Sequence, residues 1–285
     1  MDFRVALDDT MLYIKKFRKR NEKILNSSTR KTTKNIVNLH WWSRCMRDKV
    51  ENVGDFLSTV VFDYMLKQKG ICHDQVVNHT AHLYAIGSII QGGAQNAVIW
   101  GSGLKHGVKD ISPLVRLTRK LDVRLVRGPE TRNALLGRGY KCPLKFGDPA
   151  ILMPLIYQPK EMEKKDYLVV LHFKTQYDLP NAITPLTEDY QSFMDKIYNS
   201  KLVISSSLHG IILAEAYGIP AILLKDTETE NMFKYNDYYH STGRYDFPVT
   251  QTIEEALSII PPSVPNFTEM RKDIMSSFPY DLWGK

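Results

Sequence analysis

The segment from Lys201 to Leu224 constrains the fold of this chain more than any other. It begins with a short apolar run and three serines, after which the sequence predicts a helix of about ten residues starting near His209. Gly218 ends this helix, Pro220 prevents its continuation, and Ala221–Leu224 is apolar enough to be the next buried strand. A strand–loop–helix–strand unit of this length joins parallel strands, so the sequence predicts an α/β fold with a parallel sheet.

The loop inside this unit is a candidate binding site. It lies at the carboxyl end of a strand, where open α/β sheets bind their ligands. The hydroxyls of Ser205, Ser206 and Ser207, the free N–H groups of the helix and the imidazole of His209 could converge there on an anion. The alternative is a helix start with serine caps and a partly exposed histidine, and these residues alone leave both interpretations open.

Length and composition favour one large or two modest domains. The chain has 285 residues, of which 43% are hydrophobic, and each half contains its own series of alternating strands and helices. A polar, proline-containing stretch separates the two halves. We therefore predict a basic N-terminal arm (1–35), a first domain (36–156), a linker (157–166) and a second domain (167–285) whose final helix is free to return to the first.

Positive charge is concentrated at the start of the chain. The net charge is +7, and residues 1–35 contribute +6 of it through ten Lys and Arg against four Asp and Glu. Residues 11–25 can form a basic amphipathic helix. Such a helix either packs on the body with a solvated face or lies on an anionic membrane surface. No nucleic-acid partner is expected, because stacking aromatics and a recognised reader motif are missing from the arm.

The cysteines and the apolar runs indicate the cellular compartment that suits this chain. Cys45, Cys72 and Cys142 are scattered and form no CxxC pair, which argues against a disulfide framework and against a zinc site. No apolar run is long enough to span a membrane. We expect a cytoplasmic protein, peripheral at the inner face of the membrane if the arm binds lipid. No cluster has metal-ligand spacing, so no metal is predicted.

Four loops at predicted strand ends share the features of an anion site. Their glycines allow close backbone approach, and their cations and hydroxyls suit phosphate or carboxylate. The residues are Asn52, Gly54 and Asp55 in the first loop, Gly101, Ser102, Gly103 and Lys105 in the second, Arg127 in the third, and Ser205, Ser206, Ser207, His209 and Gly210 in the fourth. Because the loops come from both halves, they indicate an anionic ligand held between two domains.

Two of these residues are candidates for proton transfer. His209 heads a predicted helix and is suited to act as a general acid or base. Asp55 is placed to cap the helix expected from Phe56 to Lys69, and it is the weaker candidate for base work or acceptor binding. His172 is interpreted as a structural residue at the end of a strand.

The ordered set of motifs resembles the polysaccharide pyruvyl transferase family. The matching pieces are Asn52-Val53-Gly54-Asp55, Val98–Gly103, Arg127-Gly128-Pro129, Gly147-Asp148-Pro149-Ala150 and Ser205–Gly210. Each is moderately specific, and their common order over roughly residues 36–240 is much more so. The resemblance implies two Rossmann-like domains facing across a cleft, as in the GT-B architecture.

The resemblance also implies a reaction. The family transfers a pyruvyl group from phosphoenolpyruvate, its donor substrate, to a saccharide as a cyclic ketal, with no further cofactor. The acceptor is a polysaccharide or a lipid-linked sugar, as in exopolysaccharide and capsule synthesis. The family histidine matches His209, the implied acid. Many members have arginine where this chain has Ser207, a departure that Arg127 or Lys105 could compensate.

Two alternatives stay open on sequence grounds. A GT-B glycosyltransferase using a nucleotide sugar would have the same fold and phosphate loops, with an acidic ribose ligand such as Glu215 in the second domain. A non-catalytic, membrane-docked component of polysaccharide assembly, or a nucleic-acid binder using the arm, would bind no small anion between the domains.

Overall fold

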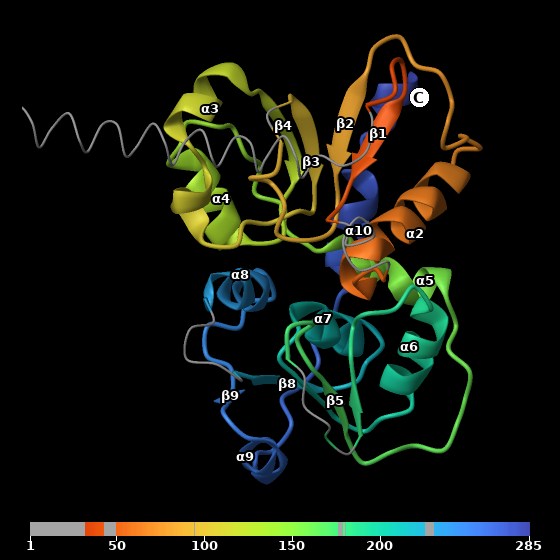
Figure 1. Cartoon of the computed structure of the whole chain (residues 1–285), viewed down its shortest axis with the longest axis vertical. Coiled ribbons are helices and arrows are strands. Elements are labelled where there is room, and N and C mark those ends of the chain that lie inside the picture. Colours follow the sequence, from red (N-terminus) through yellow and green to blue (C-terminus); the bar gives the residue numbers. More distant parts are fainter. Residues whose placement is uncertain (1–31, 43–49, 94, 176–178, 180, 226–230) are drawn as a thin grey trace, which may run out of the picture.

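A computed structural model describes residues 32–42, 50–93, 95–175, 179, 181–225 and 231–285. The predicted amphipathic helix 11–25, nearly all of the basic arm and Cys45 lie outside the described residues. Two parallel sheets, each with its own helices, make up the molecule (Figure 1). The predicted α/β class with parallel sheets is confirmed.

The first sheet comes from the N-terminal half of the chain. Its four strands are parallel and lie in the order β1-β2-β3-β4, with Val37 opposite Ala81 at the start of the first pair. The strands are β1 (Val37–His40), β2 (Ala81–Tyr84), β3 (Ala97–Trp100) and β4 (Leu121–Leu125). The helical elements are α2 (Val53–Lys67), η1 (Gly107–Asp110), α3 (Pro113–Thr118), α4 (Pro129–Leu136), η2 (Pro149–Leu152) and α5 (Met153–Ile156).

The second sheet has five parallel strands in the order β6-β5-β7-β8-β9. The chain therefore leaves β5 towards one side and returns on the other, so the strand order reverses at β5. The strands are β5 (Leu168–Val170), β6 (Ala182–Ile183), β7 (Val203–Ser205), β8 (Ala221–Leu224) and β9 (Val249–Thr250). The helical elements are α6 (Tyr190–Tyr198), α7 (Leu208–Ala216), α8 (Phe233–Ser241), α9 (Ile253–Ser258), α10 (Thr268–Ser276) and η3 (Tyr280–Trp283).

Central strands of both sheets are buried along their whole length. Every residue of β3, β5, β7 and β8 is buried, which explains why these segments are runs of apolar residues without alternation, apart from Ser205 at the end of β7. Parallel sheets covered by helices on both faces produce this pattern. The same packing directs the polar loops to the carboxyl ends of the strands.

The last helices pack on the first sheet. The indole Nε1 of Trp100 donates to the carbonyl of Ile274 at 2.8 Å, and the ring of Phe278 meets Trp100 edge-on at 4.8 Å. Tyr280 donates to the carbonyl of Met65 at 2.7 Å. The rings of Phe278 and Trp283 also pack on Phe62 of α2, at 6.1 and 5.9 Å. Residues 274–283 thus cover a face of the first sheet, although they follow the second sheet in the sequence.

Residues 157–166, the predicted linker, lie along α6. The hydroxyl of Tyr157 donates to Asp195 at 2.8 Å, and the amide of Lys160 donates to the same carboxylate at 2.8 Å. Lys165 forms a parallel bridge with Ser200. This segment is therefore tied to the second sheet's helix by hydrogen bonds, and the domain boundaries stay a prediction.

Candidate active site

Asn52, and not Asp55, caps helix α2. Its Oδ1 accepts the backbone N–H groups of Gly54 at 3.1 Å and Asp55 at 3.5 Å, so α2 begins at Val53. The sequence-based expectation that Asp55 caps a helix from Phe56 was wrong, because the helix begins three residues earlier and the side chain of Asn52 already satisfies its first N–H groups. The carboxylate of Asp55 is consequently not used as a cap.

Asp55 is partly buried among other charged groups. Burial raises its pKa to about 7, with Asp148 and Glu51 adding to the rise and His209 and Lys234 opposing it. A Cβ at Gly87 would lie 2.7 Å from Asp55 Oδ1, and Gly87 itself has a φ of +108°. The close contact and the backbone conformation both favour glycine at that position. A carboxyl group with a pKa near neutrality can take up and release a proton at physiological pH.

His209 stands in the first turn of α7, after the strand β7. The carboxyl ends of β5 and β7 flank the reversal of strand order, which is where open α/β sheets bind ligands. The ring reaches across to the start of α2: a Cβ at Gly54 would overlap its Nδ1 and Cγ atoms. Gly54 is therefore needed as glycine to admit the imidazole, which brings the first and fourth predicted loops together.

Asp148 faces His209 from the loop before η2. Its Oδ1 accepts the amide of Ala150 at 3.0 Å, while its Oδ2 lies 3.8 Å from Nε2 of His209. Both Oδ2 and Nε2 are buried, and neither has a hydrogen-bond partner among the residues that the structure describes. A buried polar atom without a partner is costly, so two that face each other suggest a place where a ligand completes the hydrogen bonding.

The three serines divide into two structural roles. Ser205 Oγ accepts the amide of Ser207 at 3.0 Å and lies 2.9 Å from the carbonyl of Val170, and Ser206 Oγ accepts the amide of His172 at 2.8 Å. These two hydroxyls tie the ends of β5 and β7 together. Ser207 is the N-cap of α7, and within the described chain its side chain makes no capping hydrogen bond. Of the three predicted anion ligands, the structure leaves Ser207 available at the helix N-terminus.

Gly210 is buried one turn further on, where a Cβ would overlap Ser205 Oγ.

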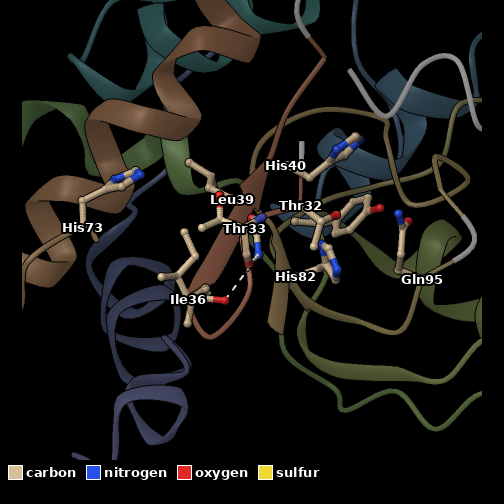
Figure 2. Close-up of a pocket in the computed structure, with 11 residues that line it drawn as sticks. Thr32, Thr33, Ile36, Leu39, His40, His73, His82 and Gln95 are labelled. Atoms are coloured by element: carbon tan, nitrogen blue, oxygen red, sulfur yellow. Dashed lines mark hydrogen bonds between the residues drawn. The ribbon is translucent and has the colours of Figure 1, made fainter. Parts of the chain in front are cut away.

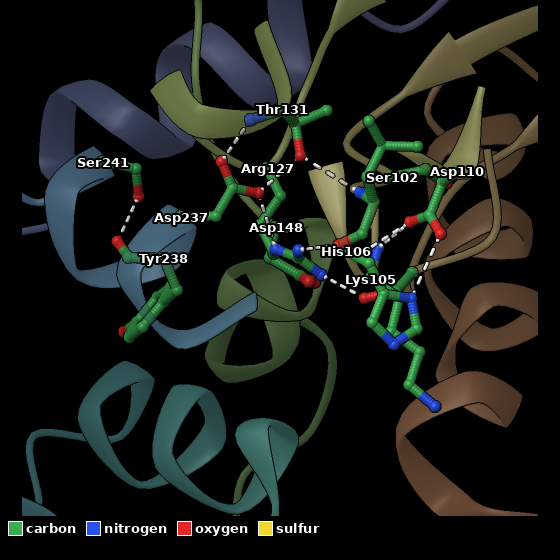
Figure 3. A network of polar contacts seen from close by, with 12 residues as sticks. Ser102, Lys105, His106, Asp110, Arg127, Thr131, Asp148, Asp237, Tyr238 and Ser241 are labelled. Atoms are coloured by element: carbon green, nitrogen blue, oxygen red, sulfur yellow. Dashed lines mark hydrogen bonds and ion pairs between the residues drawn. The ribbon is translucent and has the colours of Figure 1, made fainter. Parts of the chain in front are cut away.

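Arg127 belongs to a buried network that sequence reasoning did not foresee. Its side chain is 1% exposed and donates from Nε to Asp237 at 3.0 Å, from Nη1 to Ser88 at 2.7 Å and from Nη2 to the carbonyl of Leu104 at 2.8 Å. Asp237 also accepts the amide and hydroxyl of Thr131 at 2.8 and 2.7 Å (Figure 3). The guanidinium holds α8 against the loops of the first sheet. This geometry differs from the predicted contact with a ligand anion.

The loop after β3 supplies one exposed cation. Ser102 donates to the carbonyl of Ala85 at 2.6 Å, and Gly103 leaves room for the guanidinium of Arg127. Gly101, with a φ of +93°, packs on the ring of Pro149. Lys105 is exposed, and Figure 3 shows its ammonium group apart from the hydrogen-bond network. Of this loop, Lys105 is the residue that the structure leaves accessible to an anion.

A shallow pocket of about 160 Å³ lies elsewhere, over strands β1 and β2 (Figure 2). Its described lining includes His40, His82, Tyr84 and Gln95, and none of the predicted site residues. Burial lowers the pKa of His40 to about 4, and the positive charge of Arg119 contributes. The imidazole of His40 is tilted against the ring of Tyr84 at 4.5 Å, and as a neutral group it offers no acid at neutral pH.

Among the described residues, no group of three or more His, Cys, Asp or Glu side chains is arranged to hold a metal ion. Within the same part of the chain, no helix has the length and apolar character needed to cross a membrane.

Two parallel sheets, with the imidazole of His209 and the carboxyl groups of Asp148 and Asp55 close together, define an α/β protein. The chain belongs to the polysaccharide pyruvyl transferase family, whose sequence profile matches residues 52–226, more than half of the chain. The resemblance inferred from the motifs is confirmed. Every predicted site residue lies within the matched range, whereas Asp237 lies beyond it.

Two known proteins are similar to this chain in sequence. The succinoglycan biosynthesis protein ExoV of Rhizobium meliloti (strain 1021) is 26% identical over 210 residues, covering 67% of this chain and 62% of ExoV. The uncharacterized protein L143 of Acanthamoeba polyphaga mimivirus is 24% identical over 210 residues, covering 67% of this chain and 71% of L143. The match thus spans less than two thirds of the length of ExoV.

Sequence reasoning missed Asp148 and Asp237 as site-forming residues. Asp148 precedes Pro149 and Ala150, a pattern that also signals the start of a helix, and it does cap η2 through Oδ1. Its second oxygen, Oδ2, faces Nε2 of His209, and this role in the site is the one that the sequence did not reveal. Asp237 lies in an aromatic-rich helix, and the signal for it was Arg127, because a buried arginine calls for an acidic partner.

Proposed function

We propose that this protein transfers the pyruvyl group of phosphoenolpyruvate to two hydroxyls of a saccharide, forming a cyclic ketal and releasing phosphate. The observation that carries the proposal is the meeting of His209, Asp148 and Asp55. Nε2 of His209 and Oδ2 of Asp148 are buried, lie 3.8 Å apart and have no hydrogen-bond partner in the described part of the chain. Membership of the family supports this reaction class. The name of ExoV supports a role in polysaccharide biosynthesis.

His209 acts as the acid on the donor in this proposal. The protonated imidazole gives a proton from Nε2 to the methylene carbon of phosphoenolpyruvate, which becomes the methyl group. The carboxylate of Asp148 forms an ion pair with the ring when the ring is protonated. Because this carboxylate lies 3.8 Å from Nε2, the Nε2 proton stays free for transfer to the donor. The adjacent carbon gains oxocarbenium character and accepts an oxygen from the saccharide.

Asp55 acts as the base on the acceptor. Its carboxylate removes the proton of the attacking hydroxyl, a role that suits a pKa of about 7. Addition of this hydroxyl across the double bond gives a phosphorylated intermediate. The second hydroxyl then forms a C–O bond at the same carbon, the C–O bond to phosphate breaks, and the hydroxyl's proton leaves with the phosphate or the solvent. One donor and one diol thus become one ketal and one inorganic phosphate.

The donor is a small polyanion, and the described site offers three kinds of ligand for it. The N-terminus of α7 presents backbone N–H groups, Ser207 presents its hydroxyl, and Lys105 presents an exposed cation. Many family members have arginine at the position of Ser207. Because Arg127 is occupied by Asp237, we assign the compensating charge to Lys105.

The acceptor is proposed to be a polysaccharide or a lipid-linked saccharide. Two hydroxyls on one sugar ring are needed to close the ketal, and the two sheets would face each other across the cleft that receives them. A cytoplasmic site, with contact to the inner face of the membrane, is proposed on the same basis. The arm 1–35 is one candidate for that contact.

Ligand-dependent thermal stabilisation tests the proposal. A ligand that binds only the folded state raises the melting temperature, so phosphoenolpyruvate should stabilise the protein and uridine diphosphate should not. Lys105→Met should weaken the stabilisation, and Lys120→Met, an exposed lysine outside the site, should not. Phosphate release in the presence of a saccharide acceptor should then depend on His209.

The nucleotide arm of this test addresses the glycosyltransferase alternative. Stabilisation by uridine diphosphate alone would favour it over pyruvyl transfer. The structure gives that alternative little support from Glu215, which is buried, pairs with Arg244 at 2.6 and 2.7 Å and accepts the hydroxyl of Tyr238 at 2.5 Å. If neither phosphoenolpyruvate nor uridine diphosphate stabilises the protein, the non-catalytic alternative is favoured.

A further inference from the structure

Helix α3 exposes apolar side chains that pack on no core. None of its six residues is buried, although three of them are Leu or Val. Leu117 is 80% exposed and Leu114 is 47% exposed. Neither belongs to the core clusters of the described chain. A surface helix of a globular protein usually turns its apolar stripe inward, so this outward display needs a reason.

The exposed surface continues onto neighbouring elements. Arg116 donates to the carbonyls of Arg138 and Gly139 at 3.2 and 2.7 Å, and Arg138 donates to the carbonyl of Val108 at 3.3 Å. These bonds join α3 to the end of α4 and to η1, and Figure 1 shows α3 and α4 together at the side of the first sheet remote from α2. Val108 in η1 and Leu136 in α4 are also exposed. We call Val108, Leu114, Leu117 and Leu136 the α3 face.

The α3 face comes from a basic stretch of the sequence, in which Arg124, Arg127 and Lys145 pair with carboxylates from outside it. Residues 105–145 contain eleven Lys and Arg against three Asp and Glu, a net charge of +8, whereas residues 36–285 as a whole carry +1. The rest of the body is therefore at −7. Near the face, Lys109, Lys120 and Lys141 are exposed, and no carboxylate of the described chain pairs with any of the three.

We propose that the α3 face docks the protein on a lipid bilayer that contains anionic lipids. Leucine side chains insert at the boundary of headgroups and acyl chains, and flanking lysines attract anionic headgroups, with each cation near the surface worth about fivefold in affinity. The charge separation within the body orients the molecule, because its acidic remainder is repelled from the same surface. The docking is peripheral, and it does not depend on which group the active site transfers.

This surface is distinct from the basic arm. The arm lies almost wholly outside the described residues, whereas the α3 face is part of the folded body between β3 and the loop after α4. If the α3 face binds the bilayer, substitutions on this face weaken membrane binding by the full chain. If the arm alone binds it, the same substitutions leave membrane binding unchanged.

Vesicle flotation of the full-length protein tests the proposal. Vesicles contain phosphatidylcholine alone or phosphatidylcholine with about one third phosphatidylglycerol, a fraction chosen to give a strong negative surface potential. The double variants are Leu114→Glu with Leu117→Glu, and Lys109→Glu with Lys120→Glu. The matched control is Ile260→Glu, at an apolar residue that is 90% exposed on the other half of the chain. Circular dichroism verifies that each variant is folded.

We expect the unmodified protein and the Ile260→Glu variant to float with anionic vesicles and to stay unbound with neutral ones. Each double variant should bind anionic vesicles at least tenfold more weakly. Equal binding by the leucine variant and the unmodified protein would overturn the proposal and assign the contact to the arm. Absence of binding by the unmodified protein would overturn it as well, and so would equal binding to neutral vesicles. Phosphoenolpyruvate-dependent stabilisation is measured separately, so failure of the docking leaves the proposed function untouched.

Discussion

Replacing Asp55 by Asn should stabilise the protein, and the gain should grow with pH. Burial raises the pKa of Asp55 from 3.8 to about 7, which means that the folded state holds this proton more tightly than the unfolded state does. The folded state is therefore penalised as pH rises from about 4 to about 7, and the penalty is constant above that range. Asparagine has nearly the same shape and carries no charge at any of these pH values.

The size of the effect follows from the two pKa values. Linkage gives a penalty of about 1.7 kcal/mol at pH 5 and about 4.3 kcal/mol at pH 8, a difference of about 2.6 kcal/mol. Because Asp55 keeps part of its solvent exposure, we expect about 1–2 kcal/mol of this difference to be measurable. The site thus holds a carboxyl group whose ionisation opposes folding, as expected for a residue retained for chemistry.

Urea denaturation at pH 5 and pH 8 measures the prediction. The free energy of unfolding of the Asp55→Asn variant should exceed that of the unmodified protein more at pH 8 than at pH 5. Asp74→Asn, an exposed residue beyond the end of α2, serves as the control and should change little at either pH. The reasoning would be refuted if the Asp55→Asn variant gained the same free energy of unfolding at both pH values. It would also be refuted if the variant were less stable than the unmodified protein at pH 8.

Four other predictions concern the site and its support. His209→Gln should lower kcat by about 10²–10⁴, and Asp148→Asn should lower kcat with a smaller change in KM, both measured by phosphate release. Gly54→Ala should reduce kcat at least tenfold, because the added methyl group occupies the space of the imidazole, and a crystal structure of the variant should show the ring displaced. Arg127→Met should cost about 3–5 kcal/mol in urea denaturation by leaving Asp237 buried without its cation, whereas adding Asp237→Leu should restore much of the loss.

Much of the fold could be predicted from local patterns. The unit around His209 has a buried strand, a turn and a helix with a clear end, so its parallel crossover follows from chain geometry. The order of motifs also indicated which loops lie at strand carboxyl ends. Two of those loops, the ones with Gly54 and His209, do meet, and their contact depends on the absence of a side chain at Gly54.

Side-chain roles were harder to predict, because a residue type does not reveal its partner. Ser205 and Ser206 are as suited to a phosphate as to a backbone carbonyl, and the structure turns both to the backbone. Arg127 looked like an anion ligand, yet its partner Asp237 lies 110 positions later in the chain. Such long-range pairs are set by how the two sheets pack, which no local pattern encodes.

The packing of residues 274–283 on the first sheet has a consequence for synthesis on the ribosome. Domains generally fold as the chain emerges, N-terminal part first. Here the face of the first sheet around Trp100 and Phe62 stays uncovered until Ile274, Phe278 and Trp283 have been made. The N-terminal half must therefore wait, with apolar surface exposed, while the whole second sheet is translated, and a ribosome that stalls in the second half leaves an intermediate that chaperones would be expected to bind.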